Sequence, residues 1–340
     1  MSRTSRRRTV TLVVLVLLAL TGVGVLLRTP TPHIELPAEK LVGPANLPGP
    51  FDFAITNTMI AAWITIILLV GLAWAGTRRM SLVPRGVQNL VEAIVEGGLS
   101  FVEGVAGKKN GRRFFPIVMT IFLFVLVDNW MGLLPFYNTV GVVRPGEGDR
   151  VYRQVDVAGA KIDVLMPGPQ KEEQQPGKGE VRGTLMPFLR GATTDLNLPL
   201  ALAVTSFLFI EYWGVSSRGF FRYAGHFFNV RRLLRGNLFL GFTDVFSGLL
   251  ELISELARVI SFTFRLFGNI FAGEVLIATM SFALPLVFPV LLFLGLELFV
   301  GFIQAFIFAM LTLVFGVLAV STVHDEQAPA GHKPVPAEGG

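Results

Sequence analysis

The chain contains no cysteine and has few charged residues, and each shortage excludes a class of protein. Without cysteine there can be no disulfide, no thiolate metal site and no cysteine nucleophile. Charged residues make up only 16% of the 340 positions, while hydrophobic residues make up 52%. Soluble domains carry about 25% charged residues, so the composition indicates an integral membrane protein.

The chain is also poor in the residues of metal sites and nucleotide-binding loops. Its four histidines are far apart and show no metal-ligand spacing. It has no phosphate-binding loop and no nucleophile triad, so we expect no cofactor, no metal and no catalysis by this chain alone. The net charge of +5 comes from basic clusters beside apolar runs. Such clusters set membrane topology, so nucleic acid is not an expected partner.

The N-terminal part of the chain contains one apolar run and one polar stretch. Four arginines lie within residues 1–8, and residues 9–27 are uncharged. A signal-peptide core has about 7–15 residues, so the longer run favours a retained signal anchor in residues 1–28 over a cleaved signal peptide. Residues 29–53 are polar and rich in proline, which indicates an exposed linker.

The first membrane spans are expected within residues 54–137. Residues 54–76 are uncharged and long enough to cross a bilayer. The basic pair Arg78 and Arg79 places the end of this span on the cytoplasmic side. Over residues 84–106, apolar positions at helical spacing with glutamates between them predict an amphipathic helix. This helix either lies on the membrane surface or packs on a neighbouring helix.

The chain then crosses the membrane twice more, on either side of a long polar insertion. Residues 114–137 form the next span and contain Asp128. Residues 138–195 are rich in glycine, proline and charge, and a connection this long needs structure of its own or is partly disordered. We place it on the outer side, because the stronger basic clusters lie in the short loops. The returning span, 196–214, carries Glu211 near its end.

The remaining apolar sequence is too long for one span. As a single helix, residues 241–320 would be about 120 Å long, against a bilayer core of about 30 Å. The chain must therefore turn back, and Pro285 and Pro289 mark the place. We expect two long tilted helices within a core of residues 196–323, followed by a flexible cytoplasmic tail over 324–340.

Arg265 places a permanent charge within the first of these helices. A charged side chain at the membrane centre costs at least about 2.5–3.5 kcal/mol on insertion scales, so such residues are retained for ion pathways, pairing or binding. Arginine does not lose its proton in practice. At about 100° per residue, Glu251, Arg265 and Asn269 share one face of the helix, and Glu274 points to the opposite side.

The second long helix has a polar face as well, because Glu297 and Gln304 are seven residues apart. Polar groups within spans either line an ion path or hold helices together through hydrogen bonds. We favour an ion path for the charged groups Arg265, Glu274 and Glu297.

Four other charged residues have different explanations. For Arg258 and Glu255 we expect either a position at a helix end or a structural pair. Asp128 and Glu211 are each either a channel carboxylate or a group at the headgroup boundary. Carboxylates can pass protons on, whereas a guanidinium cannot.

Several short motifs together resemble the signature of ATP synthase subunit a. The most specific is RLFGNIFAGE, which runs from Arg265 to Glu274. The others are ITNT, NWMGLLP, TDLN and QAFIF, which begin at positions 55, 129, 194 and 304. They occur in the order of the family over most of residues 51–323.

The resemblance implies an all-α integral membrane protein with five family helices, plus the N-terminal apolar segment. One of the five is the amphipathic surface helix, and two are the long tilted helices. It implies a stator subunit of the F-type ATP synthase, multi-pass in the bacterial inner (plasma) membrane, with a cytoplasmic C-terminus. The implied partners are the ring of c subunits, b-type peripheral stalk subunits, protons and the lipid bilayer. The ATP chemistry then belongs to partner subunits.

By the same resemblance, protons pass through two offset half-channels that meet the ring from opposite sides of the membrane. Arg265 separates them, because it attracts the deprotonated carboxylate of a ring subunit and blocks direct leakage. The residues expected to translocate protons are Arg265, Asn269, Glu274, Glu297, Gln304 and Glu251, with Asp128 and Glu211 as further half-channel candidates.

The chain departs from the family pattern in three respects. Position 297 is often histidine in relatives, but here it is Glu297, and two close carboxylates at 274 and 297 would keep at least one proton at rest. Val259 stands where many relatives have proline, which predicts a less kinked helix. The N-terminal segment and the insertion 138–195 lie outside the pattern.

Two rival functions follow from the residues alone. A stand-alone secondary transporter would contain inverted repeats with paired broken helices, and no such repeat is evident in the sequence. A scaffold subunit without transport would tolerate the replacement of Arg265.

Overall fold

The computed structural model describes residues 38–42, 54–157, 160–165, 180–219, 238–283 and 287–327. The signal anchor predicted for residues 1–28, most of the linker, the turn at Pro285 and the tail beyond residue 327 lie outside the described residues.

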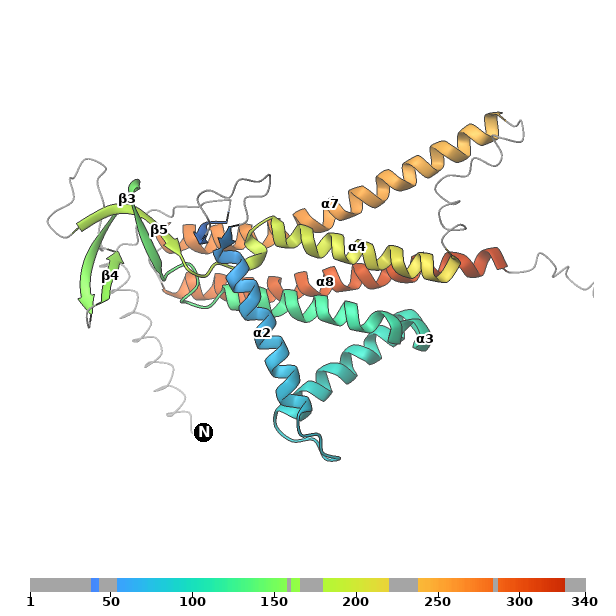
Figure 1. The fold of residues 1–340 in the computed structure, drawn as a ribbon, viewed down its shortest axis with the longest axis horizontal. Coiled ribbons are helices and arrows are strands. Elements are labelled where there is room, and N and C mark those ends of the chain that lie inside the picture. Colours follow the sequence, from blue (N-terminus) through green and yellow to red (C-terminus); the bar gives the residue numbers. More distant parts are fainter. Residues whose placement is uncertain are drawn as a thin grey trace, which may run out of the picture. The chain divides into compact units, whose positions relative to one another are not determined.

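Long helices dominate the described chain (Figure 1). They are α2 (Asn57–Thr77), α3 (Val87–Gly132), α4 (Asn197–Arg218), α7 (Leu238–Ala283) and α8 (Val287–Gln327). Four of them, α2, α3, α4 and α8, contain a stretch long and apolar enough to cross a membrane. The all-α integral membrane fold is thereby confirmed. Among the described residues, α7 is not one of these four.

The insertion contains a three-stranded antiparallel sheet, which resolves the choice between structure and disorder for its described residues. Its strands are β3 (Gly141–Val157), β4 (Ala160–Leu165) and β5 (Glu180–Pro187), in the order β4-β3-β5 (Figure 1). The 3₁₀ turn η1 (Ala192–Thr194) follows the sheet. A separate short pairing joins β1 (Lys40–Val42) to β2 (Ile55–Thr56).

The chain forms two compact units, and α3, α4, α7 and α8 each contribute a segment to both. The described residues of the first unit fall within 1–79, 122–199 and 264–306, and those of the second fall within 80–121, 200–263 and 307–340. We describe each unit separately.

In the first unit, α2 begins at a conventional helix cap and has an apolar exposed surface. The Thr56 side chain accepts a hydrogen bond from the Met59 backbone N–H at 3.3 Å, which satisfies one of the free donors of the first turn. Ile67 is 70% exposed and Trp74 is 60% exposed. An exposed face of this kind suits a helix that contacts lipid.

In the second unit, α3 folds back on itself at Gly107 (Figure 1). Gly107 has φ of 74°, a left-handed conformation that glycine adopts without strain. The two limbs then pack closely, because a Cβ on Gly98 would lie 2.8 Å from the sulfur of Met119. The first limb matches the predicted 84–106 helix, and this packing corresponds to the alternative of a helix packed on a neighbour.

The second unit also has a core of large aromatic side chains. Trp213 is 2% exposed, and its ring centroid lies 4.2 Å from that of Phe114. Gly316 makes room for it, because a Cβ there would lie 2.7 Å from the Trp213 ring.

α7 runs through Val259 without a break in the helix, as the absence of proline at that position leads one to expect.

Candidate functional site

Asn269 and Gln304 join the polar faces of α7 and α8 within the first unit. The Asn269 side-chain amide donates to Gln304 Oε1 at 2.7 Å. Gln304 is 1% exposed, whereas Asn269 is exposed. The two faces derived from helical spacing therefore meet at this hydrogen bond.

Arg265 lies one turn before Asn269 and has no partner within the described chain. Its side chain is exposed, and it makes no ion pair or hydrogen bond with any described residue. Gly268 and Ala272, on the same face, are exposed as well, and a Cβ on Gly268 would have nothing within 4 Å. Arg265 is thus a permanent cation on an open face built from small residues.

Glu297 is buried beside α7. It is 7% exposed, and its Oε1 atom has no hydrogen-bond partner among the described residues. Its carboxylate lies directly against Gly273, where a Cβ would overlap it. A buried carboxyl without a partner is unfavourable unless a proton or water satisfies it. Glu297 therefore does not serve simply to hold the two helices together.

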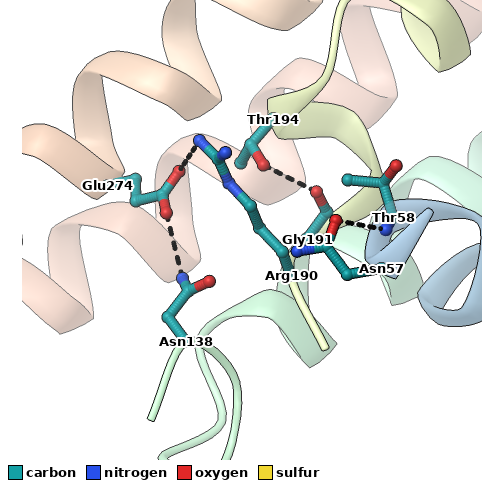
Figure 2. A network of polar contacts seen from close by, with 7 residues as sticks. All are labelled: Asn57, Thr58, Asn138, Arg190, Gly191, Thr194 and Glu274. Atoms are coloured by element: carbon teal, nitrogen blue, oxygen red, sulfur yellow. Dashed lines mark hydrogen bonds and ion pairs between the residues drawn. The ribbon is translucent and has the colours of Figure 1, made fainter. Parts of the chain in front are cut away.

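Glu274 is held by two donors that sequence reasoning did not identify. The Asn138 side-chain amide donates to its Oε1 at 3.0 Å, and Arg190 Nη2 lies 3.4 Å from its Oε2. Figure 2 shows the carboxylate of Glu274 between these two side chains. The Arg190 side chain is 7% exposed and that of Glu274 is 26% exposed. In the sequence, Arg190 is one basic residue among several in the insertion, and nothing local distinguishes it.

The structure does not bring Glu274 and Glu297 into hydrogen-bond contact within the described chain. Glu297 lies against Gly273, the residue before Glu274, while Glu274 is bound to Asn138 and Arg190. The shared proton expected for the pair therefore stays a prediction. The geometry gives the two carboxylates different surroundings.

Asp128 lies in a buried network at the end of α3. It is 1% exposed and accepts hydrogen bonds from the Thr193 backbone N–H at 3.1 Å and from the Thr65 hydroxyl at 3.3 Å. The neighbouring Asn129 accepts from the Thr193 hydroxyl at 2.9 Å and donates to the Gly301 carbonyl of α8 at 3.2 Å. These contacts link α2, α3, η1 and α8 through polar side chains, and Thr65 and Thr193 are members that the sequence alone did not indicate.

The second unit holds a separate group of charged side chains. Arg258 Nη1 pairs with Glu255 Oε2 at 2.8 Å, and its guanidinium lies 3.9 Å from the ring centroid of Phe315. Glu211 of α4 and Glu251 of α7 are close enough to act electrostatically on Glu255. The structural pair expected for Arg258 and Glu255 is present, and two candidate carboxylates lie beside it.

Comparison with known proteins identifies the family. A model of the ATP synthase A chain family matches residues 59–316, which include α3, α4, α7 and most of α8. The chain belongs to this family. The match includes Arg265, Glu274, Glu297 and Gln304.

Several similar proteins carry the name ATP synthase subunit a. ATP synthase subunit a of Campylobacter jejuni subsp. doylei is 30% identical over 261 residues, which cover 76% of this chain and 87% of the relative. The proteins of the same name from Campylobacter fetus subsp. fetus and Helicobacter acinonychis are 29% and 27% identical, and they cover 77% of this chain. Family membership and the four apolar helices together make the chain a multi-pass membrane protein.

Proposed function

We propose that this chain is the stationary membrane subunit of an F-type ATP synthase, and that it conducts protons along a rotating ring of c subunits. The observation that carries the proposal is Arg265. It is exposed, it has no ion-pair partner in the described chain, and Gly268 and Ala272 open the surface beside it. A permanent charge on an apolar helix needs compensation, and small residues let another helix approach closely. A ring subunit with an intramembrane carboxylate supplies both.

In this proposal Arg265 attracts the deprotonated ring carboxylate and separates two half-channels. Its guanidinium cannot give up a proton, so it blocks direct leakage. Protons then cross the membrane only while bound to the carboxylates of the rotating ring. The membrane potential contributes about 2.3 kcal/mol of driving energy per charge per 100 mV.

The polar residues of the two units are assigned to the two half-channels. In the first unit these are Asn269, Gln304, Glu297, Glu274 and Asp128. Three observations support this assignment: the Asn269–Gln304 hydrogen bond, the Glu297 Oε1 atom without a partner among the described residues, and the buried network of Asp128.

In the second unit, Glu251 and Glu211 are the candidates for the other half-channel. Both carboxylates lie close enough to Glu255, the partner of Arg258, to act on it through their charge. Carboxylates can relay protons, so the group suits a proton half-channel.

Family membership and the composition support the remaining parts of the proposal. The partners are the c-subunit ring and b-type peripheral stalk subunits, and the ATP chemistry takes place on partner subunits. The protein is placed in the bacterial inner membrane, with residues 138–195 outside and the C-terminus in the cytoplasm.

Replacement of Arg265 tests this function. Arg265→Ala in the assembled complex, reconstituted into vesicles, is expected to lower ATP-driven proton pumping by at least about a hundredfold, since a charge essential to the cycle is lost. Arg85→Ala is the matched control, because Arg85 is also exposed but lies outside the helices, and it should pump normally. Full pumping by the assembled Arg265→Ala complex would instead support a scaffold without transport.

A further inference from the structure

The sheet in the insertion is continuous with the two residues that bind Glu274. β3 and β5 pair down to Gly141 opposite Pro187. Beyond this pair the ladder continues, because the Phe188 N–H donates to the Val140 carbonyl at 2.9 Å and the Asn138 N–H donates to the Leu189 carbonyl at 2.9 Å. We call residues 138–145 and 183–190 the base of the sheet. Asn138 and Arg190 are its two last residues.

The base brings both donors to one carboxylate. Asn138 donates to Glu274 Oε1 at 3.0 Å, and Arg190 lies 3.4 Å from the other oxygen, Oε2 (Figure 2). Glu274 is 136 residues from Asn138 and 84 from Arg190. The pairing of β3 with β5 and its continuation beyond Gly141 bring these two donors side by side.

The base is also closely fitted and firmly anchored. A Cβ on Gly141 would overlap the Met186 carbonyl, so the two strands lie too close together there for any side chain at position 141. On the far side of Arg190, the Gly191 carbonyl accepts from the Thr194 hydroxyl at 2.7 Å (Figure 2). Asn138 itself has φ of 59°, a left-handed conformation that asparagine tolerates better than most residues.

We propose that the base of this sheet is a clamp that positions the Glu274 carboxylate, with Asn138 and Arg190 as its positioning residues. This inference rests on the proposed function, in which Glu274 lines a half-channel. Neither an amide nor a guanidinium can take up and release a proton at ordinary pH. The clamp therefore orients the carboxylate and does not carry protons itself. The insertion thereby contributes to conduction, although it is not part of the membrane helices.

Two substitutions at Asn138 separate the side-chain donor from the backbone conformation. Asn138→Gly keeps the left-handed backbone but removes the donor. Asn138→Asp also tolerates this backbone but places a carboxylate against that of Glu274. Proton pumping by the reconstituted complex should fall about threefold in Asn138→Gly, because the hydrogen bond to the Glu274 carboxylate is lost. It should fall about tenfold or more in Asn138→Asp, because two carboxylates then repel each other. Equal pumping in both variants would overturn the clamp.

A double-substitution cycle tests whether Arg190 acts through Glu274. Arg190→Gln should lower pumping by about tenfold in the otherwise unchanged chain. In a Glu274→Gln background, the same substitution should change pumping by less than about twofold, because the negative charge that pairs with Arg190 is absent. A merely structural role of Arg190 would give the same loss in both backgrounds and would refute the inference. Arg190→Lys should restore part of the activity, since it retains the charge.

A trimmed chain distinguishes the base from the rest of the sheet. Residues 146–182 are replaced by Asn-Gly, a dipeptide that favours a two-residue hairpin turn between antiparallel strands. The new turn then joins position 145 to position 183, which are partners in the β3–β5 ladder. The trimmed complex should pump normally, whereas Gly141→Val in the full-length chain should lower pumping. The opposite pair of results would assign the role to the removed strands and not to the base.

The Arg265→Ala complex is measured in the same assay to keep the two proposals apart. Loss of pumping in Arg265→Ala with normal pumping in all clamp variants would refute only the clamp. Normal pumping in Arg265→Ala would refute the proposed function itself. Immunodetection of the subunit in purified complex shows that each variant has assembled.

Discussion

Arg265 and Arg190 are two arginines of the first unit with opposite surroundings. Arg190 is 6% exposed and pairs with Glu274 at 3.4 Å. Arg265 is exposed on α7 and has no ion-pair partner in the described chain. A buried arginine with a partner is part of the protein's own packing. An exposed arginine on an apolar helix needs a partner from outside the chain, and the difference separates an internal support from a contact surface.

The largest effect is expected when each arginine is neutralised in turn. Arg190→Gln should lower the free energy of unfolding by about 2–4 kcal/mol, because it breaks a buried ion pair. We expect a value near the lower end of this range, because the Glu274 side chain is 26% exposed. Arg265→Gln should leave the stability of the isolated subunit within about 0.5 kcal/mol, as at other surface sites. Thermal unfolding in detergent measures both. A large destabilisation by Arg265→Gln would show that it has a partner within the chain.

Two glycines of α7 offer a second test of the same distinction. A Cβ on Gly273 would overlap the Glu297 carboxylate, whereas one on Gly268 would meet nothing within 4 Å. Gly273→Ala should therefore destabilise the subunit by about 1–3 kcal/mol through overpacking. Gly268→Ala should leave the isolated subunit as stable, or slightly more stable through its better helix propensity.

The measurement for the glycine pair combines unfolding of the subunit with pumping by the complex. Gly268→Ala should lower pumping although the subunit is unharmed, because the added methyl group lies on the surface assigned to the ring. Unchanged pumping in Gly268→Ala would place the ring contact elsewhere on the helix.

The smallest effect is expected at Arg258, which resembles Arg190 in having a partner within the chain. It pairs with Glu255 at 2.8 Å and its guanidinium lies 3.9 Å from the Phe315 ring centroid. Arg258→Lys keeps the charge but loses the planar stacking. It should destabilise the subunit by about 0.5–1 kcal/mol and leave pumping near normal. Strong loss of pumping in Arg258→Lys would move this residue from a structural to a conducting role.

The sequence predicts those parts of the site that lie on one helix. The period of the α-helix places Arg265 and Asn269 on one face of α7, and it places Glu297 and Gln304 on one face of α8. The hydrogen bond between Asn269 and Gln304 joins these faces. Such relations depend on local geometry, which residue spacing reports directly.

Contacts between distant segments could not be predicted in this way. The ion pair of Arg190 with Glu274 spans 84 residues, and no spacing rule connects two groups so far apart. The local signal for the sheet is short, since the alternation of apolar and polar side chains at Val155, Asp156 and Val157 covers fewer residues than the roughly four that indicate a strand. The many glycines and prolines of the insertion are also typical of disordered segments, so its composition did not predict a sheet. Tertiary pairing then decided which polar groups of the insertion reach the helices.

The order of synthesis gives the base of the sheet a further consequence. Asn138 and Arg190 leave the ribosome well before Glu274, and strands that are close in sequence can pair quickly. The two donors can thus be in place when the newly made α7 arrives. A carboxylate that would be costly to leave without a partner then meets its partners as it docks. The sheet would in that case serve as an assembly guide for the helix, and variants that weaken the base would slow insertion of α7 as well as alter the finished protein.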